Sequence, residues 1–143
     1  MEECQLQQGL CGFYYEPKHL IVIDETMLDF QKRCTLCHEL VHAHNHDQGC
    51  SPYGSKAERR ARLYTALRLI NPHEYAIAER MYGADSYLIA CELDVTVQVI
   101  EDYKNWLHEK VVPEKLRTLD RGRPWRDSQF ASTRLSPSRD MSR

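Results

Sequence analysis

The residues best suited to chemistry lie together in one short segment, RCTLCHELVHAHNHD, from Arg33 to Asp47. Within fifteen positions it holds two cysteines, four histidines and a glutamate. These side chains bind transition metals, so the segment predicts a metal site. Two interpretations overlap in it. CTLCH has the spacing of covalent haem attachment, and HELVH has the spacing of a zinc peptidase.

The haem interpretation is the weaker one, because such attachment belongs to an oxidising compartment. The N-terminus MEECQLQQGLCGF lacks the apolar segment behind a basic start that a secretory signal has. The chain also has no apolar run long enough to span a bilayer. We therefore expect a cytoplasmic protein with reduced cysteines. Cys34 and Cys37 are then expected to be small buried residues on one helix face.

The HELVH motif predicts a catalytic zinc site. Histidines four positions apart on a helix share one face, so His38 and His42 can bind the same ion. Glu39 is placed to take a proton from water, while zinc lowers the pKa of bound water to about 7 and polarises the carbonyl under attack. His44 and His46 are expected to be solvated or to lie around the ligands. A catalytic zinc ion takes three protein ligands, so one must come from another segment.

The third ligand separates the subclasses of these enzymes. A metzincin would have Gly at position 45 and His or Asp at position 48, and Asn45 and Gln48 exclude it. The other common solution is a glutamate on a following helix, where Glu58 is the best candidate. Glu58 would otherwise be a capping-box acid or a surface partner of Arg62. Two weaker candidates follow the break at residues 71–72, namely Glu74 and Glu79.

Two strands and a helix are predicted around the motif. Aromatic and β-branched residues predict short strands at Phe13–Tyr15 and Leu20–Ile23, on either side of a turn at residues 16–18. Apolar residues at helical spacing predict a helix over Asp29–His44, which carries HELVH. Residues 47–55 are rich in Gly, Pro and Ser and predict a loop.

Further helices are predicted after that loop. Ser55 is the expected N-cap of a helix that carries Glu58 and ends at Asn71-Pro72. A short helix ends at Gly83, and two more meet near Asp94 in a helix-turn-helix-like pattern. The expected fold is α+β and mostly helical. It has a zincin-like core of the gluzincin type, a small N-terminal β-hairpin and this C-terminal helical segment.

Charge divides the chain near residue 117. Residues 1–116 carry 12 Lys/Arg against 18 Asp/Glu, a net charge of −6, and residues 117–143 carry 7 Arg against 3 Asp, a net charge of +4. We expect one domain over residues 1–116, which includes the helix-turn-helix-like helices at about 87–108. Residues 117–143 are expected to be a disordered Arg/Ser/Pro-rich tail. Nucleic-acid binding is expected only weakly, through that tail, because acids predominate in the helix-turn-helix-like segment.

In order along the chain, these segments resemble the ImmA/IrrE family of metallopeptidases, especially small members from phages and mobile elements. The resemblance covers residues 12–108. It rests on HLIVIDETMLDFQKRCTLCHELVHAHNHD, on KAERRARLYTALRLINPHEYAIAE and on LIACELDVTVQVIEDYKNWL. It implies that His38, His42 and Glu58 bind one Zn²⁺ per chain and that Glu39 is the general base.

The resemblance also implies a substrate class, the helix-turn-helix repressors, which are cut to derepress phage, mobile-element or stress genes. The protein would then be a cytoplasmic endopeptidase, in a bacterial host if a phage encodes it. The alternative is a non-catalytic module that sequesters a regulator, with a structural or vestigial metal site. The strand Leu20–Ile23 would either pair with an extended substrate or be a plain core strand. The candidates for stabilising the oxyanion are Tyr53, Tyr64 and His46.

Overall fold

The computed structural model describes residues 1–7, 9–47 and 55–111. Residues 1–109 form one compact unit, to which the following description applies. Most of the loop predicted at 47–55 lies outside the described residues. The same holds for the domain boundary at 116–117 and for the tail at 117–143. Among the described residues, no helix has the length and apolar content needed to cross a bilayer.

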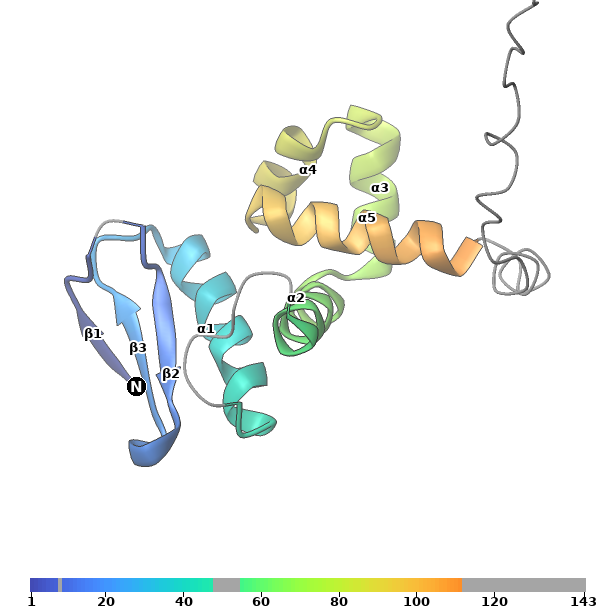
Figure 1. Cartoon of the computed structure of the whole chain (residues 1–143). Coiled ribbons are helices and arrows are strands. Elements are labelled where there is room, and N and C mark those ends of the chain that lie inside the picture. Colours follow the sequence, from blue (N-terminus) through green and yellow to red (C-terminus); the bar gives the residue numbers. More distant parts are fainter. Residues whose placement is uncertain (8, 48–54, 112–143) are drawn as a thin grey trace, which may run out of the picture. The chain divides into compact units, whose positions relative to one another are not determined.

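The predicted β-hairpin is present at the N-terminal end of the chain (Figure 1). Its strands are β2 (Gly12–Tyr15) and β3 (Leu20–Asp24), joined by a 3-10 turn at Glu16–Lys18. They pair antiparallel, with Phe13 opposite Val22. Pro17 sits at the start of the 3-10 turn, where its fixed φ is compatible with the backbone.

A third strand, β1 (Glu2–Cys4), pairs parallel to β3 and gives the sheet order β1-β3-β2. Its three residues are all exposed, so it lacks the alternation of apolar and polar residues that reveals a strand. Because β3 is the central strand, the hypothesis that Leu20–Ile23 pairs with a substrate is wrong. The alternative, a buried core strand, is confirmed.

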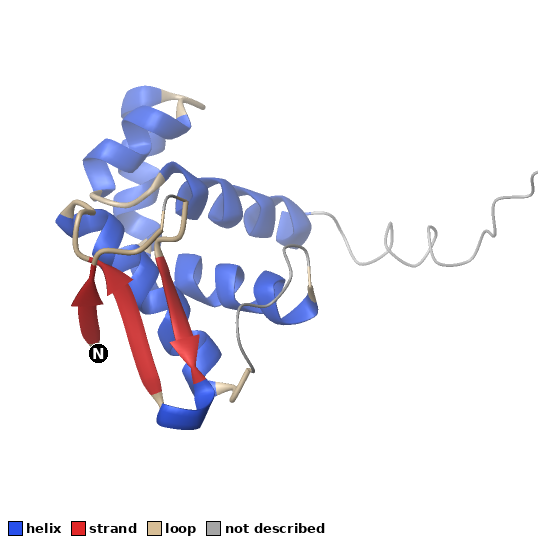
Figure 2. Cartoon of the chain, turned by 60° about the vertical axis from the view of Figure 1, so that its left-hand side comes forward, coloured by secondary structure: helices blue, strands red, loops and turns tan. Residues whose placement is uncertain are grey.

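Helix α1 (Asp29–His44) has the predicted boundaries and lies between the sheet and α2 (Figures 1 and 2). On one side, Leu36 and Ala43 pack against the apolar residues of β2 and β3. On another side, Cys34 joins the core formed by the later helices. Both Cys34 and Cys37 are buried free thiols, as predicted.

The other helices are α2 (Lys56–Leu69), α3 (Pro72–Tyr82), α4 (Ser86–Leu93) and α5 (Val97–Val111). Helix α3 begins at the predicted break, where the Asn71 side chain accepts a hydrogen bond from the His73 N–H. Helices α4 and α5 meet at Asp94, whose φ is 53°. Ile89 and Ile100 are completely buried in the core of these helices. The structure is therefore of the α+β class and mostly helical, as expected.

Candidate metal centre

Three side chains from two helices meet at one point. His38 and His42 lie one turn apart on α1, and their Nε2 atoms are 3.1 Å from each other. Oε2 of Glu58, in the first turn of α2, lies 3.3 Å from Nε2 of His38 and 3.4 Å from Nε2 of His42. In the part of the chain that the structure describes, this is the one group of three or more His, Cys, Asp or Glu that could hold a metal.

The spacing of the three atoms fits a single ion. In a tetrahedral site with bonds of about 2.0–2.1 Å, the ligand atoms are about 3.3 Å apart. The triangle formed by the two imidazoles and the carboxylate has sides close to that length. These three residues would therefore supply three ligands to such an ion, and a catalytic zinc site with three protein ligands would keep one position for water or substrate.

Helix α2 brings Glu58 to the histidines through its N-terminal cap and its close approach to α1. The Ser55 hydroxyl accepts a hydrogen bond from the Glu58 N–H, with 3.1 Å between Oγ and N. This is the predicted cap, and the Glu58 carboxylate turns to the histidines. Ala61, one turn later, is completely buried, and its small side chain allows α2 to pack closely on α1.

The arginine predicted as a possible partner of Glu58 binds another helix, and the two weaker candidates for the third ligand lie outside the cluster. Arg62, a possible surface partner of Glu58, binds Asp102 on α5, with 3.0 Å between Nε and Oδ2. Glu74 and Glu79 lie on α3, outside the cluster. Glu79 accepts a hydrogen bond from the Tyr75 hydroxyl.

Asp47 and Arg60 complete the site, and sequence reasoning missed both. Oδ2 of Asp47 lies 2.9 Å from Nδ1 of His42, and Nη2 of Arg60 lies 2.8 and 2.9 Å from the two Asp47 oxygens. Burial alone would raise the pKa of Asp47, but hydrogen bonds from His42 and Arg60 lower it. An ionised Asp47 holds the proton of His42 on Nδ1 and leaves Nε2 to face the cluster. The sequence feature that could have indicated Asp47 is an acid five positions after the second histidine of the motif.

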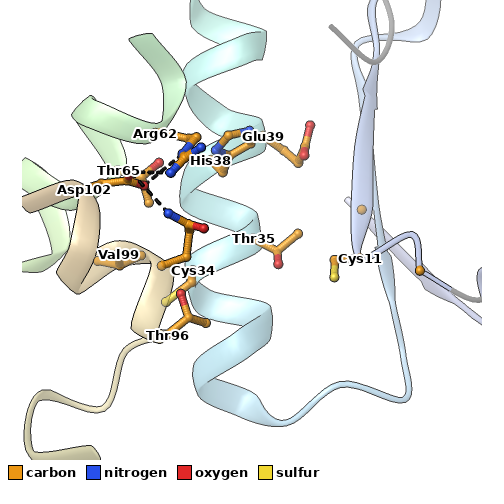
Figure 3. Close-up of a pocket in the computed structure, with 13 residues that line it drawn as sticks. Cys11, Cys34, Thr35, His38, Glu39, Arg62, Thr65, Thr96, Val99 and Asp102 are labelled. Carbon is orange, nitrogen blue, oxygen red and sulfur yellow. Dashed lines mark hydrogen bonds and ion pairs between the residues drawn. The ribbon is translucent and has the colours of Figure 1, made fainter. Parts of the chain in front are cut away.

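Glu39 is buried, only 8% exposed, and lies outside the ligand triangle. Figure 3 shows it leaving α1 toward the strand side, whereas His38 is directed toward Arg62. Burial raises the pKa of Glu39 to about 7. His42 lowers this pKa, Glu58 raises it, and a hydrogen bond from the Tyr14 backbone lowers it. Because a carboxylate accepts that bond from the Tyr14 N–H, the edge of β2 that has no partner strand among the described residues faces Glu39.

The histidine electrostatics favour metal binding. Burial lowers the pKa of His38, and the neighbouring Glu58 carboxylate acts in the opposite direction. A lowered pKa favours the neutral imidazole, which is the form that binds metals. His38 is therefore available as a ligand without first losing a proton at neutral pH.

The remaining candidate residues lie away from the cluster. His44 is exposed, and exposed His46 binds Glu16 at the hairpin turn, with 3.0 Å between Nδ1 and Oε1. Tyr64 is 56% exposed on α2. Neither Tyr64 nor His46 lines the cavity beside Glu39. Tyr53, the third candidate for stabilising the oxyanion, lies outside the described residues.

Comparison with known proteins identifies one family. The sequence model described as the IrrE N-terminal-like domain, a peptidase family, matches residues 5–102. The match includes both histidines, Glu39 and Glu58. Comparisons with curated proteins and with solved structures gave no significant match.

Proposed function

The chain belongs to the IrrE N-terminal-like peptidase family, and on this premise we propose that it is a zinc-dependent endopeptidase. The observation that carries the proposal is the triangle of His38, His42 and Glu58, with Glu39 buried beside it. Two imidazoles and one carboxylate are a donor set that zinc uses in peptidases. Family membership supports peptidase chemistry, and the donor set supports the choice of metal.

The two histidines and Glu58 would hold the ion, and Asp47 would orient His42 through its Nδ1–H. When bound, zinc would act as a Lewis acid that makes water more acidic and the peptide carbonyl more electrophilic. Glu39 would take a proton from water as the oxygen bonds to the carbonyl carbon. It would then deliver this proton to the amine nitrogen as the C–N bond breaks.

The free edge of β2 gives an extended peptide a place to lie. Among the described residues, β2 pairs with a strand on one side only, and the Tyr14 N–H on its other side reaches Glu39. A peptide that added a strand along this edge would bring its carbonyl groups past the general base. We assign to β2 the pairing with substrate that the sequence predicts for Leu20–Ile23.

The substrate class that we propose is a helix-turn-helix repressor of transcription, as the family resemblance implies. Direct DNA binding by α4 and α5 is less favoured. The first turns of the second helix normally enter the major groove. Here Gln98 and Asp102, from those turns of α5, line the cavity beside Glu39, and Asp102 binds Arg62.

The test combines metal analysis with cleavage. We expect one zinc ion per chain in the parent and in Glu39→Gln, and much less in Glu58→Ala. Removing the general base should slow repressor cleavage by about 100-fold or more. Glu74→Ala, which changes a glutamate outside the cluster, is the control and should keep both metal and activity.

Two results would contradict the proposal. A parent protein that binds no metal would contradict the proposed metal site. A Glu39→Gln variant that cuts at the parent rate would contradict the role of Glu39 as general base. A repressor that binds the zinc-loaded parent and stays intact would instead favour the non-catalytic alternative, a module that sequesters a regulator.

A further inference from the structure

A cavity of about 400 Å³ begins at His38 and Glu39 and extends along α1 toward its N-terminal half (Figure 3). Cys34 and Thr35 line its length on α1. If Glu39 is the general base, as proposed above, an occupant of this cavity lies directly beside the bond that is cut. The following inference therefore rests on the proposed function.

The wall opposite β2 is built by α5, a segment far from the metal motif in sequence. Thr96, just before α5, and Val99, in its first turn, both line the cavity. The wall is held in place by the ion pair between Arg62 and Asp102, whose side chains are 23% and 12% exposed. Nε2 of Gln98 adds a hydrogen bond to Oδ1 of Asp102, at 3.3 Å.

The strand side of the cavity is close to α1 because of Gly12. A Cβ atom built on Gly12 would lie 2.7 Å from Cγ2 of Thr35 and 2.9 Å from the Val22 carbonyl oxygen. No side chain fits at that distance, so a glycine is required for the approach of β2 to α1. Cys11, next to Gly12, also lines this side.

Apart from His38 and Glu39, the charged side chains that line this cavity are paired with each other. Arg62 and Asp102 neutralise each other. The other lining groups there are glycine, thiols, hydroxyls with their methyl groups, an amide and a valine. A charged substrate side chain would lose water on entering and would meet no free opposite charge, which is costly. An apolar side chain has no such penalty and gains from leaving water.

We propose that this cavity is the substrate subsite next to the scissile bond, and that it selects an uncharged, mainly apolar side chain. Gln98 contributes to this selectivity because it places an uncharged amide on the α5 wall. The substrate class is thereby narrowed to extended segments with an aliphatic or similar residue beside the cleaved bond.

The test uses the zinc-loaded Glu39→Gln protein, which keeps the cleft without cutting, to retain peptides from a random library. Retained peptides should share one position enriched in uncharged aliphatic residues. Adding Gln98→Lys should shift that position toward Asp and Glu by about threefold to fivefold, because the new ammonium supplies a partner. Asn105→Lys, on the exposed part of α5, adds the same charge outside the cavity and should leave the preference unchanged.

A second variant covers the case in which Gln98→Lys does not fold. Gln98→Ala removes part of the wall and should broaden the selected position toward larger residues. Retained peptides without a preferred position, or with a charged preferred position, would overturn the subsite. So would equal shifts from Gln98→Lys and Asn105→Lys. Peptides selected as predicted but left uncut by the parent would support the subsite and contradict the proposed peptidase activity.

Discussion

Three carboxylates near the end of α1 have three different environments. Glu39 is buried and its pKa is raised to about 7, whereas the pKa of Asp47 is lowered by hydrogen bonds from His42 and Arg60. Glu58 lies between two imidazoles. The same chemical group thus suits a proton acceptor, an orienting partner and a metal ligand, because its neighbours set which form is stable.

The pair formed by Asp47 and Arg60 should determine how well His42 binds zinc. Asp47→Ala removes the acceptor of the Nδ1–H, so we expect zinc affinity to fall by about 10–100-fold. Asp47→Asn keeps an acceptor and should recover part of the loss. Competition with a chromophoric zinc chelator measures both.

The control for this prediction is a pair of neighbouring arginines. Arg60→Ala should weaken zinc binding because Asp47 loses its ion pair, whereas exposed Arg59→Ala should have no effect. If Asp47→Ala binds zinc as tightly as the parent does, the carboxylate does not orient His42.

At the scale of secondary structure, the start of α2 has two roles. Ser55 caps the helix by accepting the Glu58 N–H, and the side chain of the same glutamate reaches the histidines of α1. Fraying of the first turn would therefore release a ligand as well as a hydrogen bond.

Ser55→Ala should lower the free energy of unfolding of the metal-free protein by about 1 kcal/mol. It should also weaken zinc binding by up to about fivefold, which corresponds to the same free energy. The matched control is Asp85→Ala, because Asp85 caps α4 by accepting the N–H groups of Tyr87 and Leu88. It should cost similar stability in denaturant titrations and leave zinc affinity unchanged. Equal effects of the two variants on zinc binding would show that the cap of α2 has no special role.

For the molecule as a whole, α1 connects two apolar cores. One contains Tyr14, Ile21 and Ile23 of the sheet, and the other contains Cys34 with the buried residues of the later helices. The candidate metal site joins α1 to α2, two helices that pack against each other. An ion bound there adds a cross-link that only the folded chain can form.

Zinc should therefore raise the melting temperature. With free zinc at 100 times its dissociation constant, the folded state gains about 2.7 kcal/mol. For a domain of this size, that gain corresponds to a rise of about 10 °C. Thermal denaturation with a chelator and with added zinc measures the difference, and Glu58→Ala should show much less of it. A parent melting temperature that does not respond to zinc would contradict a site that bridges the two helices.

Local sequence patterns were enough to predict much of the secondary structure of this protein. The boundaries of α1, the hairpin at residues 13–23 and the Ser55 cap follow from periodicity and capping chemistry, which act over a few residues. The pairing of His38 with His42 is equally local, since four positions are one turn of helix. β1 was not predicted, because its exposed residues show no alternation of apolar and polar side chains and its partner β3 is distant in sequence.

By itself, then, the sequence determined the helix that carries the motif and the two histidines that share its face. Only the tertiary structure decided which of three glutamates joins them, because that depends on how α2 packs on α1. Packing also decided that β3 lies inside the sheet and that Asp47 meets Arg60. It brought Arg62 to Asp102 across forty positions of chain. Contacts between distant segments depend on the packing of whole elements, and no short-range pattern records them.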